Sequence, residues 1–146
     1  MARLKDRPDV EFFASLAAVA RLADQRLERA APAGLSLAGL GVLGRLALGD
    51  SATPLALSRA LGASKAAMTH TLQRLESRGL VAVTQDPDDG RRKQVRLTSA
   101  GLAAQRAAQV ALRPRLDALR TAFEPAAFEA ALPFLRRLRA WLEADG

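Results

Sequence analysis

The chain has no cysteine, no tyrosine and a single histidine, and only 4% of its residues are aromatic. The lack of cysteine excludes disulfides, thiolate metal sites and thiol catalysis. One histidine, His70, without a second imidazole or a thiol argues against a zinc site. Because we also find no group of side chains arranged for catalysis, we expect no enzyme, no cofactor and no metal.

Long apolar runs are also missing. No run is long enough to span a bilayer, and the first residues, MARLKDRPDVEFF, lack the hydrophobic centre and cleavage site of a secretory signal. We therefore expect a cytoplasmic protein that has no membrane partner. With 146 residues, of which 49% are hydrophobic, the chain is suited to one folded domain with a real core.

Positive charge is in excess, with a net charge of +7. Such a balance suits a polyanionic partner, although a basic protein can also be merely soluble. The excess is spread nearly evenly along the chain. The local placement of basic residues is therefore more informative than their sum.

The centre of the chain, residues 64–101, has the pattern of a helix followed by a β-hairpin. Ser64 is a good N-cap, because its hydroxyl can accept from the free N–H groups of the next turn, and Gly79 supplies a left-handed stop. Between them Met68, Leu72 and Leu75 recur at spacings of four and three, which places them on one face. The polar residues turned outward are Lys65, Thr69, His70 and Gln73.

Two β-prone runs follow, at residues 80–84 and 94–97. The loop between them contains the turn formers Asp86, Pro87, Asp88, Asp89 and Gly90. We predict a hairpin whose second arm is lined by Arg91, Arg92, Lys93 and Arg96. These cations can meet phosphate or enter a groove of nucleic acid, or they can be a solvated charge run that protects an edge strand from aggregation.

Two shorter helices are predicted before this unit. Ser36 caps one that has Leu37, Leu40, Leu43, Leu46 and Ala47 on its apolar side and ends at Gly49, and Thr53 followed by Pro54 starts the next. The short connection at residues 62–63 is typical of a helix-turn-helix, whose second helix reads the major groove. An ordinary helical hairpin would have the same connection.

The ends of the chain are predicted to be long amphipathic helices. Asp9 is expected to cap the first, Thr98 or Ser99 the fifth, and the last follows Pro125. Pro114 and Pro133 are expected to kink their helices. The predicted apolar face of the fifth helix is Leu102, Ala103, Ala107, Val110, Leu116 and Leu119. These helices carry more apolar surface than a small domain can cover, which points to a dimer.

Three stretches together resemble the MarR family of bacterial transcriptional regulators. They are GLSLAGLGVLGRL at residues 34–46, TPLALSRALGASKAAMTHTLQRLESRGLV at 53–81 and DPDDGRRKQVRLTSAG at 86–101. In the last stretch, the Asp-x-Arg pair before Leu-Thr-x-x-Gly is the most specific part. The resemblance implies a mainly α fold with a small β-hairpin wing, in a single domain over residues 1–146. Its winged helix-turn-helix lobe would cover about residues 36–98, and its dimerisation helices about 9–30 and 99–144.

The resemblance also implies a function. We expect a homodimer that binds a palindromic operator in double-stranded DNA, usually as a repressor. In the family a small organic effector commonly lies between the DNA-binding lobe and the dimer helices and changes the separation of the reading helices. A regulator that answers to no small ligand is the other possibility. The cysteine-based peroxide sensing of some members is excluded here, and Phe12, Phe13, Arg21 and Arg45 are weak candidates for effector contacts. A winged-helix module that binds protein instead of DNA is the alternative.

The residues expected at the DNA follow from the same resemblance. The helix that begins after Ser64 would enter the major groove, and the hairpin would insert Arg91 into the minor groove, with Asp89 holding the Arg91 side chain. The expected DNA contacts are Ser64, Lys65, Ala66, Thr69, His70, Gln73, Arg74, Asp89, Arg91, Arg92 and Lys93.

Overall fold

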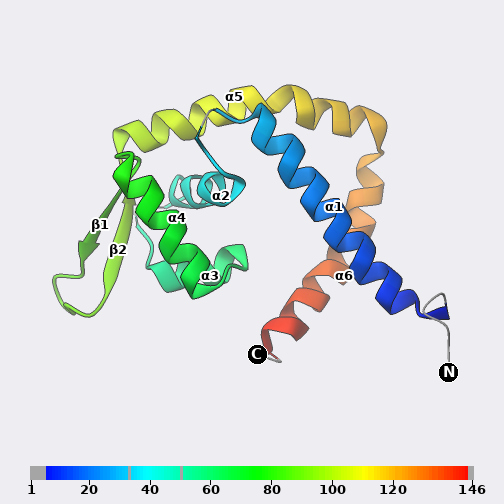
Figure 1. Ribbon diagram of the computed structural model, residues 1–146, viewed down its shortest axis with the longest axis horizontal. Helices are drawn as coiled ribbons and strands as arrows, with labels where there is room; N and C mark the ends of the chain where they lie inside the picture. Colours follow the sequence, from blue (N-terminus) through cyan, green and yellow to red (C-terminus); the bar gives the residue numbers. More distant parts are fainter. Residues whose placement is uncertain (1–5, 33, 50, 145–146) are drawn as a thin grey trace. The chain divides into compact units, whose positions relative to one another are not determined.

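The computed structural model describes residues 6–32, 34–49 and 51–144, and these form six helices and one antiparallel hairpin (Figure 1). The elements are α1 (Pro8–Ala30), α2 (Leu37–Leu46), α3 (Pro54–Leu61), α4 (Lys65–Ser77), β1 (Val81–Gln85), β2 (Lys93–Leu97), α5 (Ser99–Ala122) and α6 (Pro125–Ala144). The predicted mainly α fold with a small hairpin is confirmed. Two compact units meet in the chain between Leu112 and Arg113, so α5 continues from the first unit into the second.

Three helices of the first unit begin where the hydroxyl residues of the sequence predicted. Ser36, Thr53 and Ser64 accept hydrogen bonds from the backbone N–H groups of Gly39, Ala56 and Ala67, at 3.0, 3.1 and 3.1 Å. Each cap satisfies one of the N–H groups that the first turn leaves without an intrahelical partner. The three caps are confirmed.

The core of the first unit lies between α2, α3, α4 and the hairpin. Its side chains are almost entirely aliphatic, and Val42, Leu43, Leu57 and Val95 are completely buried. The hairpin is attached to this core by a short bridge, in which Ala52 and Val95 exchange backbone hydrogen bonds of 3.1 and 2.8 Å. Ala52 is thus joined to β2 by an isolated bridge beside the two-stranded sheet.

Two of the three glycines in α2 allow side chains of neighbouring helices to approach closely. A Cβ atom at Gly39 would lie 3.4 Å from a methyl of Leu75, and one at Gly41 would lie 3.3 Å from a methyl of Leu61, whereas nothing lies within 4 Å at Gly44. Close approach by α4 and α3 thus accounts for two of the three glycines. Gly44 lacks such a reason and only weakens the helix.

Several sequence predictions about helix ends were wrong. Asp9 does not cap α1, because Pro8 already occupies the first helical position; the carboxylate of Asp9 instead pairs with the Arg7 guanidinium at 2.5 Å. That hydrogen bond lowers the pKa of Asp9 to about 2. Helix α2 ends at Leu46, three residues before Gly49, and this leaves Ala47 exposed at the C-cap.

The predicted apolar face of α5 was also wrong in its first half. Gly101 and Ala108 are the buried residues there, whereas Ala103, Ala107 and Val110 are exposed. Small side chains face the lobe because the helix approaches it closely, and apolar periodicity does not reveal such a contact. Pro114 and Pro133 both lie inside uninterrupted helices, α5 and α6. The assignment of residues 9–30 and 99–144 to dimerisation stays a prediction.

Within the part of the chain that the structure describes, no helix is both long enough and apolar enough to cross a membrane.

A matched pair of glycine substitutions tests the close contact at the start of α5. A Cβ atom at Gly101 would lie 1.9 Å from the Leu80 carbonyl oxygen, so Gly101→Ala should lower the free energy of unfolding by about 1–3 kcal/mol or more. Gly44→Ala, with open space around it, should raise that free energy by about 0.5–1 kcal/mol. Urea unfolding measures both, and equal effects of the two substitutions would show that the contact at Gly101 is absent.

Candidate nucleic-acid interface

Helix α4 has one buried face and one exposed face. Met68, Leu72 and Leu75 are buried in the core, as predicted. The exposed side carries every residue of this helix that the sequence suggested for DNA contact, together with the cap residue. They are Ser64, Lys65, Ala66, Thr69, His70, Gln73 and Arg74.

The polar groups on this face differ in what they can still offer a partner. The hydroxyl of Thr69 donates to the carbonyl oxygen of Lys65 at 2.9 Å, which leaves its oxygen as an acceptor. The side chains of His70, Gln73 and Arg74 make no hydrogen bond or ion pair with other described residues. These three can therefore bind a partner without first breaking an internal contact.

The end of α4 is closed by two backbone hydrogen bonds. Gly79, at φ +71°, donates to the carbonyl of Glu76 at 2.9 Å, and Leu80 donates to that of Leu75 at 3.0 Å. This is the Schellman arrangement, and its usual apolar contact is present because Leu75 and Leu80 are both buried. The predicted glycine stop is confirmed.

The hairpin follows directly. Its strands pair from Val81 opposite Leu97 to Gln85 opposite Lys93. The carboxylate of Glu76 accepts from the backbone N–H of Val83 at 3.2 Å, which ties β1 to α4. Helix and hairpin are thus held together by a shared turn and by a side-chain bond.

The loop at residues 86–92 is organised by its own carboxylates. Asp86 accepts from the backbone N–H of Asp88 at 2.9 Å, and Asp89 accepts from that of Arg91 at 3.0 Å. The loop closes through a 2.7 Å bond from the N–H of Asp86 to the carbonyl of Arg92. Such bonds from Asp side chains to nearby backbone are characteristic of turns.

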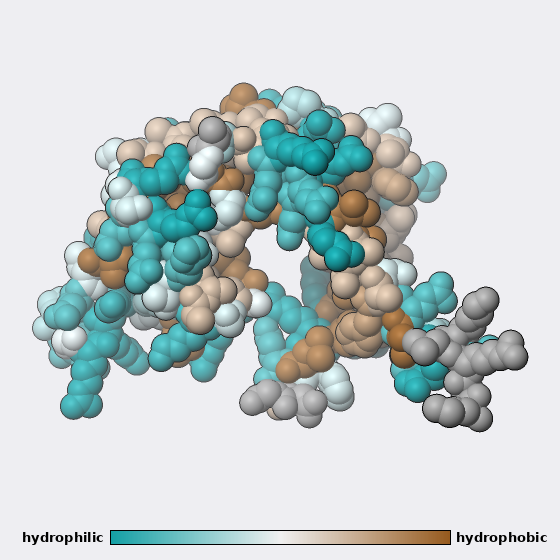
Figure 2. Space-filling view, viewed as in Figure 1, coloured by the Kyte–Doolittle hydropathy of each residue, from teal (hydrophilic) through white to brown (hydrophobic). Residues whose placement is uncertain are grey.

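Two predictions about the basic residues need correction. Arg91 and Arg92 lie in the loop and not on the second strand, which begins only at Lys93. Asp89 does not hold the Arg91 guanidinium; it binds the Arg91 backbone, and no ion pair joins the two residues. The side chains of Arg91, Arg92 and Lys93 are exposed, and Figure 2 shows hydrophilic residues gathered over this loop and over α4.

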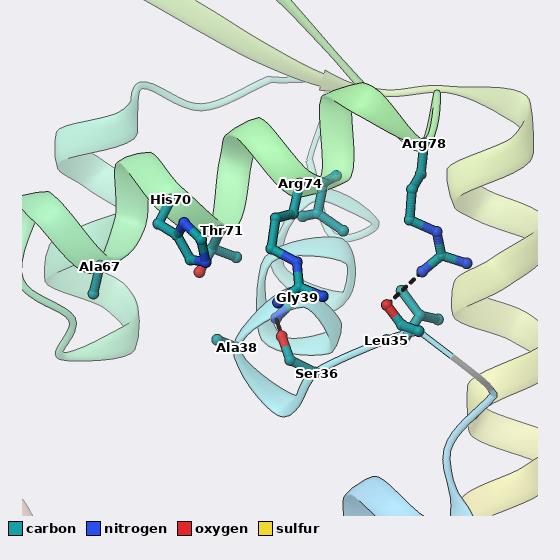
Figure 3. Close-up of a pocket in the computed structure, with 11 residues that line it drawn as sticks. Leu35, Ser36, Ala38, Gly39, Ala67, His70, Thr71, Arg74 and Arg78 are labelled. Atoms are coloured by element: carbon teal, nitrogen blue, oxygen red, sulfur yellow. Dashed lines mark hydrogen bonds between the residues drawn. The ribbon is translucent and has the colours of Figure 1, made fainter.

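A small cavity lies beside the exposed face of α4, against the beginning of α2 (Figure 3). Its volume is about 240 Å³. Leu35, Ala38, Ala67 and Leu75 line it, together with His70 and Arg74 from α4 and Arg78, the residue that follows α4. The cavity therefore combines an apolar floor with a cationic rim.

Arg78 is a cavity residue that the sequence pattern did not indicate. Its guanidinium donates to the carbonyl of Gly34 at 2.6 Å, across 44 positions of sequence. The only local signal was an arginine at the end of a helix, just before a glycine stop. The suggested effector contacts Phe12, Phe13, Arg21 and Arg45 do not line this cavity. Among the described residues, no three His, Cys, Asp or Glu side chains are grouped so that they could hold a metal ion.

Comparisons with known proteins agree with this geometry. Residues 33–92 match the model of the MarR family. No curated protein sequence matches the chain. Among solved structures, a probable transcriptional regulator from Pseudomonas aeruginosa is 28% identical, with a TM-score of 0.71 over 93% of this chain and 99% of that one.

Two further structures are less similar in sequence and closer in fold. A mutant MarR from E. coli, complexed with operator DNA, is 22% identical, with a TM-score of 0.80 over 94% of this chain and 99% of that one. BpsR from Bordetella bronchiseptica, whose DNA binding is regulated by 6-hydroxynicotinic acid, is 21% identical, with a TM-score of 0.79 over 94% and 96%.

The matched segment begins before α2 and ends in the hairpin loop, so it contains the helix-turn-helix, β1 and the loop of the wing but not β2. The structural agreement extends over nearly the whole chain. Residues 33–92 thus match the MarR family, and the chain has the winged helix-turn-helix fold of the MarR regulators that it resembles in structure.

Proposed function

We propose that the protein is a homodimeric, sequence-specific DNA-binding regulator that represses transcription from a palindromic operator. The observation that carries this proposal is the rigid connection between an exposed polar helix face and an exposed basic loop. The Schellman turn and the bond from Val83 to Glu76 hold the two together. A partner with a groove and a charged backbone fits both features at once.

In this proposal α4 lies in the major groove. Gln73 and His70 present donors and acceptors to base edges, which differ there for every base pair. Thr69 contributes an acceptor oxygen and a methyl group, since its hydroxyl already donates a hydrogen bond to the backbone carbonyl of Lys65. Lys65 and Arg74 add phosphate or base contacts from the same face.

The loop of the hairpin contacts the adjacent minor groove and its phosphates. Arg91, Arg92 and Lys93 supply three positive charges in succession, and the minor groove attracts such charges by its negative potential. Asp89 contributes indirectly, because its bond to the Arg91 backbone shapes the loop.

A second copy of the chain accounts for apolar surface that the protomer leaves open. Neither α1 nor α6 contains a buried residue. On α6, Phe128, Leu132 and Leu142 are exposed, and Trp141 is 61% exposed. A two-fold dimer would bury such surface and present two α4 helices to two half-sites about 34 Å apart.

Two other functions fit less well. A protein-interaction module would not need three adjacent cations on the loop. Regulators of this family are generally not enzymes, and we retain the proposal that this chain is none.

The cavity beside α4 is the place we assign to a small organic anion acting as effector. Its volume of about 240 Å³ is below the roughly 300–1,000 Å³ usual for drug-sized ligands, so the ligand must be small. Its carboxylate would meet His70 and Arg74, which are also proposed DNA contacts. An effector there would compete with DNA directly, in contrast to the change in helix separation that the family resemblance implies.

Substitutions on α4 and on the loop should have different effects on DNA binding. Arg91→Ala should weaken binding to operator and random DNA alike and reduce the salt slope by about 1. His70→Ala or Gln73→Ala should mainly lower the ratio of operator affinity to random-DNA affinity. The loss of discrimination is about 1–3 kcal/mol for a good base contact. Titrations at two salt concentrations measure both quantities.

Arg106→Ala is the matched control for these titrations, since it removes an exposed charge from α5, away from the proposed interface. Asp89→Ala should resemble a milder Arg91→Ala, through loss of loop order. If Arg91→Ala binds like the unsubstituted protein at both salt concentrations, the loop does not contact DNA.

A carboxylate on the apolar face of α6 should separate the dimer. Leu138 is half-buried, and Leu138→Glu would place a charge in an apolar interface at a cost of several kcal/mol. Ala140→Glu, two residues on and about 200° around the helix from Leu138, introduces the same charge on the opposite, exposed face and should leave the dimer intact. Sedimentation at micromolar concentration distinguishes the species, and a monomeric mass for the unsubstituted protein would exclude the proposed dimer.

The effector proposal can be tested with 6-hydroxynicotinic acid as a probe and a duplex that holds one half-site only. Competition at His70 and Arg74 predicts that the probe lowers affinity for the single half-site as much as for the full operator. A change in helix separation predicts loss on the full operator alone, and that result would rule out the cavity as the place of action.

A further inference from the structure

Three segments that are distant in sequence meet at the C-terminal end of α4. They are the connection between α1 and α2, the turn after α4, and the start of α5. The contacts between them involve six residues, which we call the α4 joint. These are Gly34, Arg78, Gly79, Leu80, Thr98 and Gly101.

Thr98 connects the ends of two helices through one side chain. Its hydroxyl accepts from the backbone N–H of Gly101 at 3.0 Å and so caps α5. The same hydroxyl donates to the carbonyl of Gly79 at 2.6 Å, and the Thr98 backbone N–H donates to the carbonyl of Leu80 at 3.2 Å. The start of α5 is thus bonded directly to the turn that ends α4.

Gly101 brings the two segments into contact. Its backbone lies so near the Leu80 carbonyl that a Cβ atom would be 1.9 Å from that oxygen and 2.8 Å from a methyl of Leu97. A movement of the first turn of α5 toward the end of α4 would therefore displace Leu80. Since Leu80 also closes the Schellman turn, its displacement acts on the end of α4.

Arg78 attaches the third segment from the other side. Its guanidinium donates to the carbonyl of Gly34 at 2.6 Å, in the connection that leads from α1 to α2. Gly34 has a φ of +81°, and a Cβ atom there would lie 3.1 Å from the guanidinium nitrogen. Arg78 and Gly79 are adjacent, so the two attachments share one turn of backbone.

We propose that Arg78 and Thr98 are positioning residues that set the angle of α4 from the helices outside the winged lobe. This inference rests on the proposed function and names the residues through which α1 and α5 would control the spacing of two α4 helices. With 13 residues, α4 is about 20 Å long, so a tilt of about 5° at the joint moves its first turn by roughly 2 Å. The first turn carries Lys65 and Thr69.

The apolar core alone would leave this angle less well defined. Met68, Leu72 and Leu75 hold α4 along one face, but apolar contacts are not directional and tolerate small shifts. Hydrogen bonds at one end restrict the direction of the helix axis. Loss of the joint should consequently affect how precisely two half-sites are spaced, and much less how one half-site is bound.

The test compares operators whose half-sites have the selected spacing with operators one base pair longer or shorter. One base pair rotates the second half-site by about 35°, since the helix repeats every 10–10.5 base pairs. Thr98→Val removes the hydroxyl with little change of shape, Thr98→Ser retains it, and Arg78→Ala removes the second attachment. Ser77→Ala is the control, because it removes a hydrogen bond at the same helix end that stays within α4.

We expect selectivity for the native spacing to fall about two- to tenfold in Thr98→Val and in Arg78→Ala, the effect that one hydrogen bond allows. Thr98→Ser and Ser77→Ala should keep the selectivity, and affinity for a single half-site should not change in the Thr98 and Ser77 variants. If Thr98→Val and Arg78→Ala fold and keep the spacing selectivity, the proposed role of the α4 joint is wrong and the proposed function is not affected. The same holds if these variants lose as much affinity for a single half-site as for the full operator. An unsubstituted protein that does not distinguish operator from random DNA would instead overturn the proposed function.

Discussion

The burial of one apolar stripe on α4 is the constraint on which the rest of the interface depends. Met68, Leu72 and Leu75 pack against α2, α3 and the hairpin, and each contributes about 1.5–3 kcal/mol by leaving water. The hydrogen bonds on the outer face are worth about 0.5–1.5 kcal/mol each. Packing therefore decides which face is hidden, and the polar residues at the remaining positions are exposed as a consequence.

The hairpin loop shows how acidic residues can serve a basic surface. Asp86 and Asp89 accept hydrogen bonds from the loop backbone, and this fixes the chain direction before Arg91. Neither carboxylate forms an ion pair with a described arginine, so the cationic side chains are not neutralised by contact. An acidic loop of this kind keeps its arginines available while it orders their backbone.

The terminal helices have a different source of stability. Helices α1 and α6 bury none of their residues within the protomer, although both have an apolar side. A helix in water gains little from its own hydrogen bonds, and most helical stability comes from packing of an amphipathic face. The stability of these helices is therefore tied to whatever covers them, which in the proposed function is a second copy of the chain.

Features that depend on short-range chemistry could be predicted from the amino-acid sequence. Ser36, Thr53 and Ser64 cap helices because a hydroxyl can reach an N–H three residues ahead, and Gly79 ends α4 because it can adopt a positive φ. The spacing of Met68, Leu72 and Leu75 was sufficient to choose the buried face. Even the capping role of Thr98 was visible locally, as one of two adjacent candidates.

Features that depend on residues distant in the sequence could not be predicted and are visible only in the folded chain. Arg78 reaches Gly34 across 44 residues, and nothing near Arg78 in the sequence indicates that partner. Asp89 bonds the Arg91 backbone and not its guanidinium, because the loop conformation places the N–H closer. The buried positions of α5 are Gly101 and Ala108, since a helix that approaches a carbonyl closely needs small residues, whereas periodicity selects large ones.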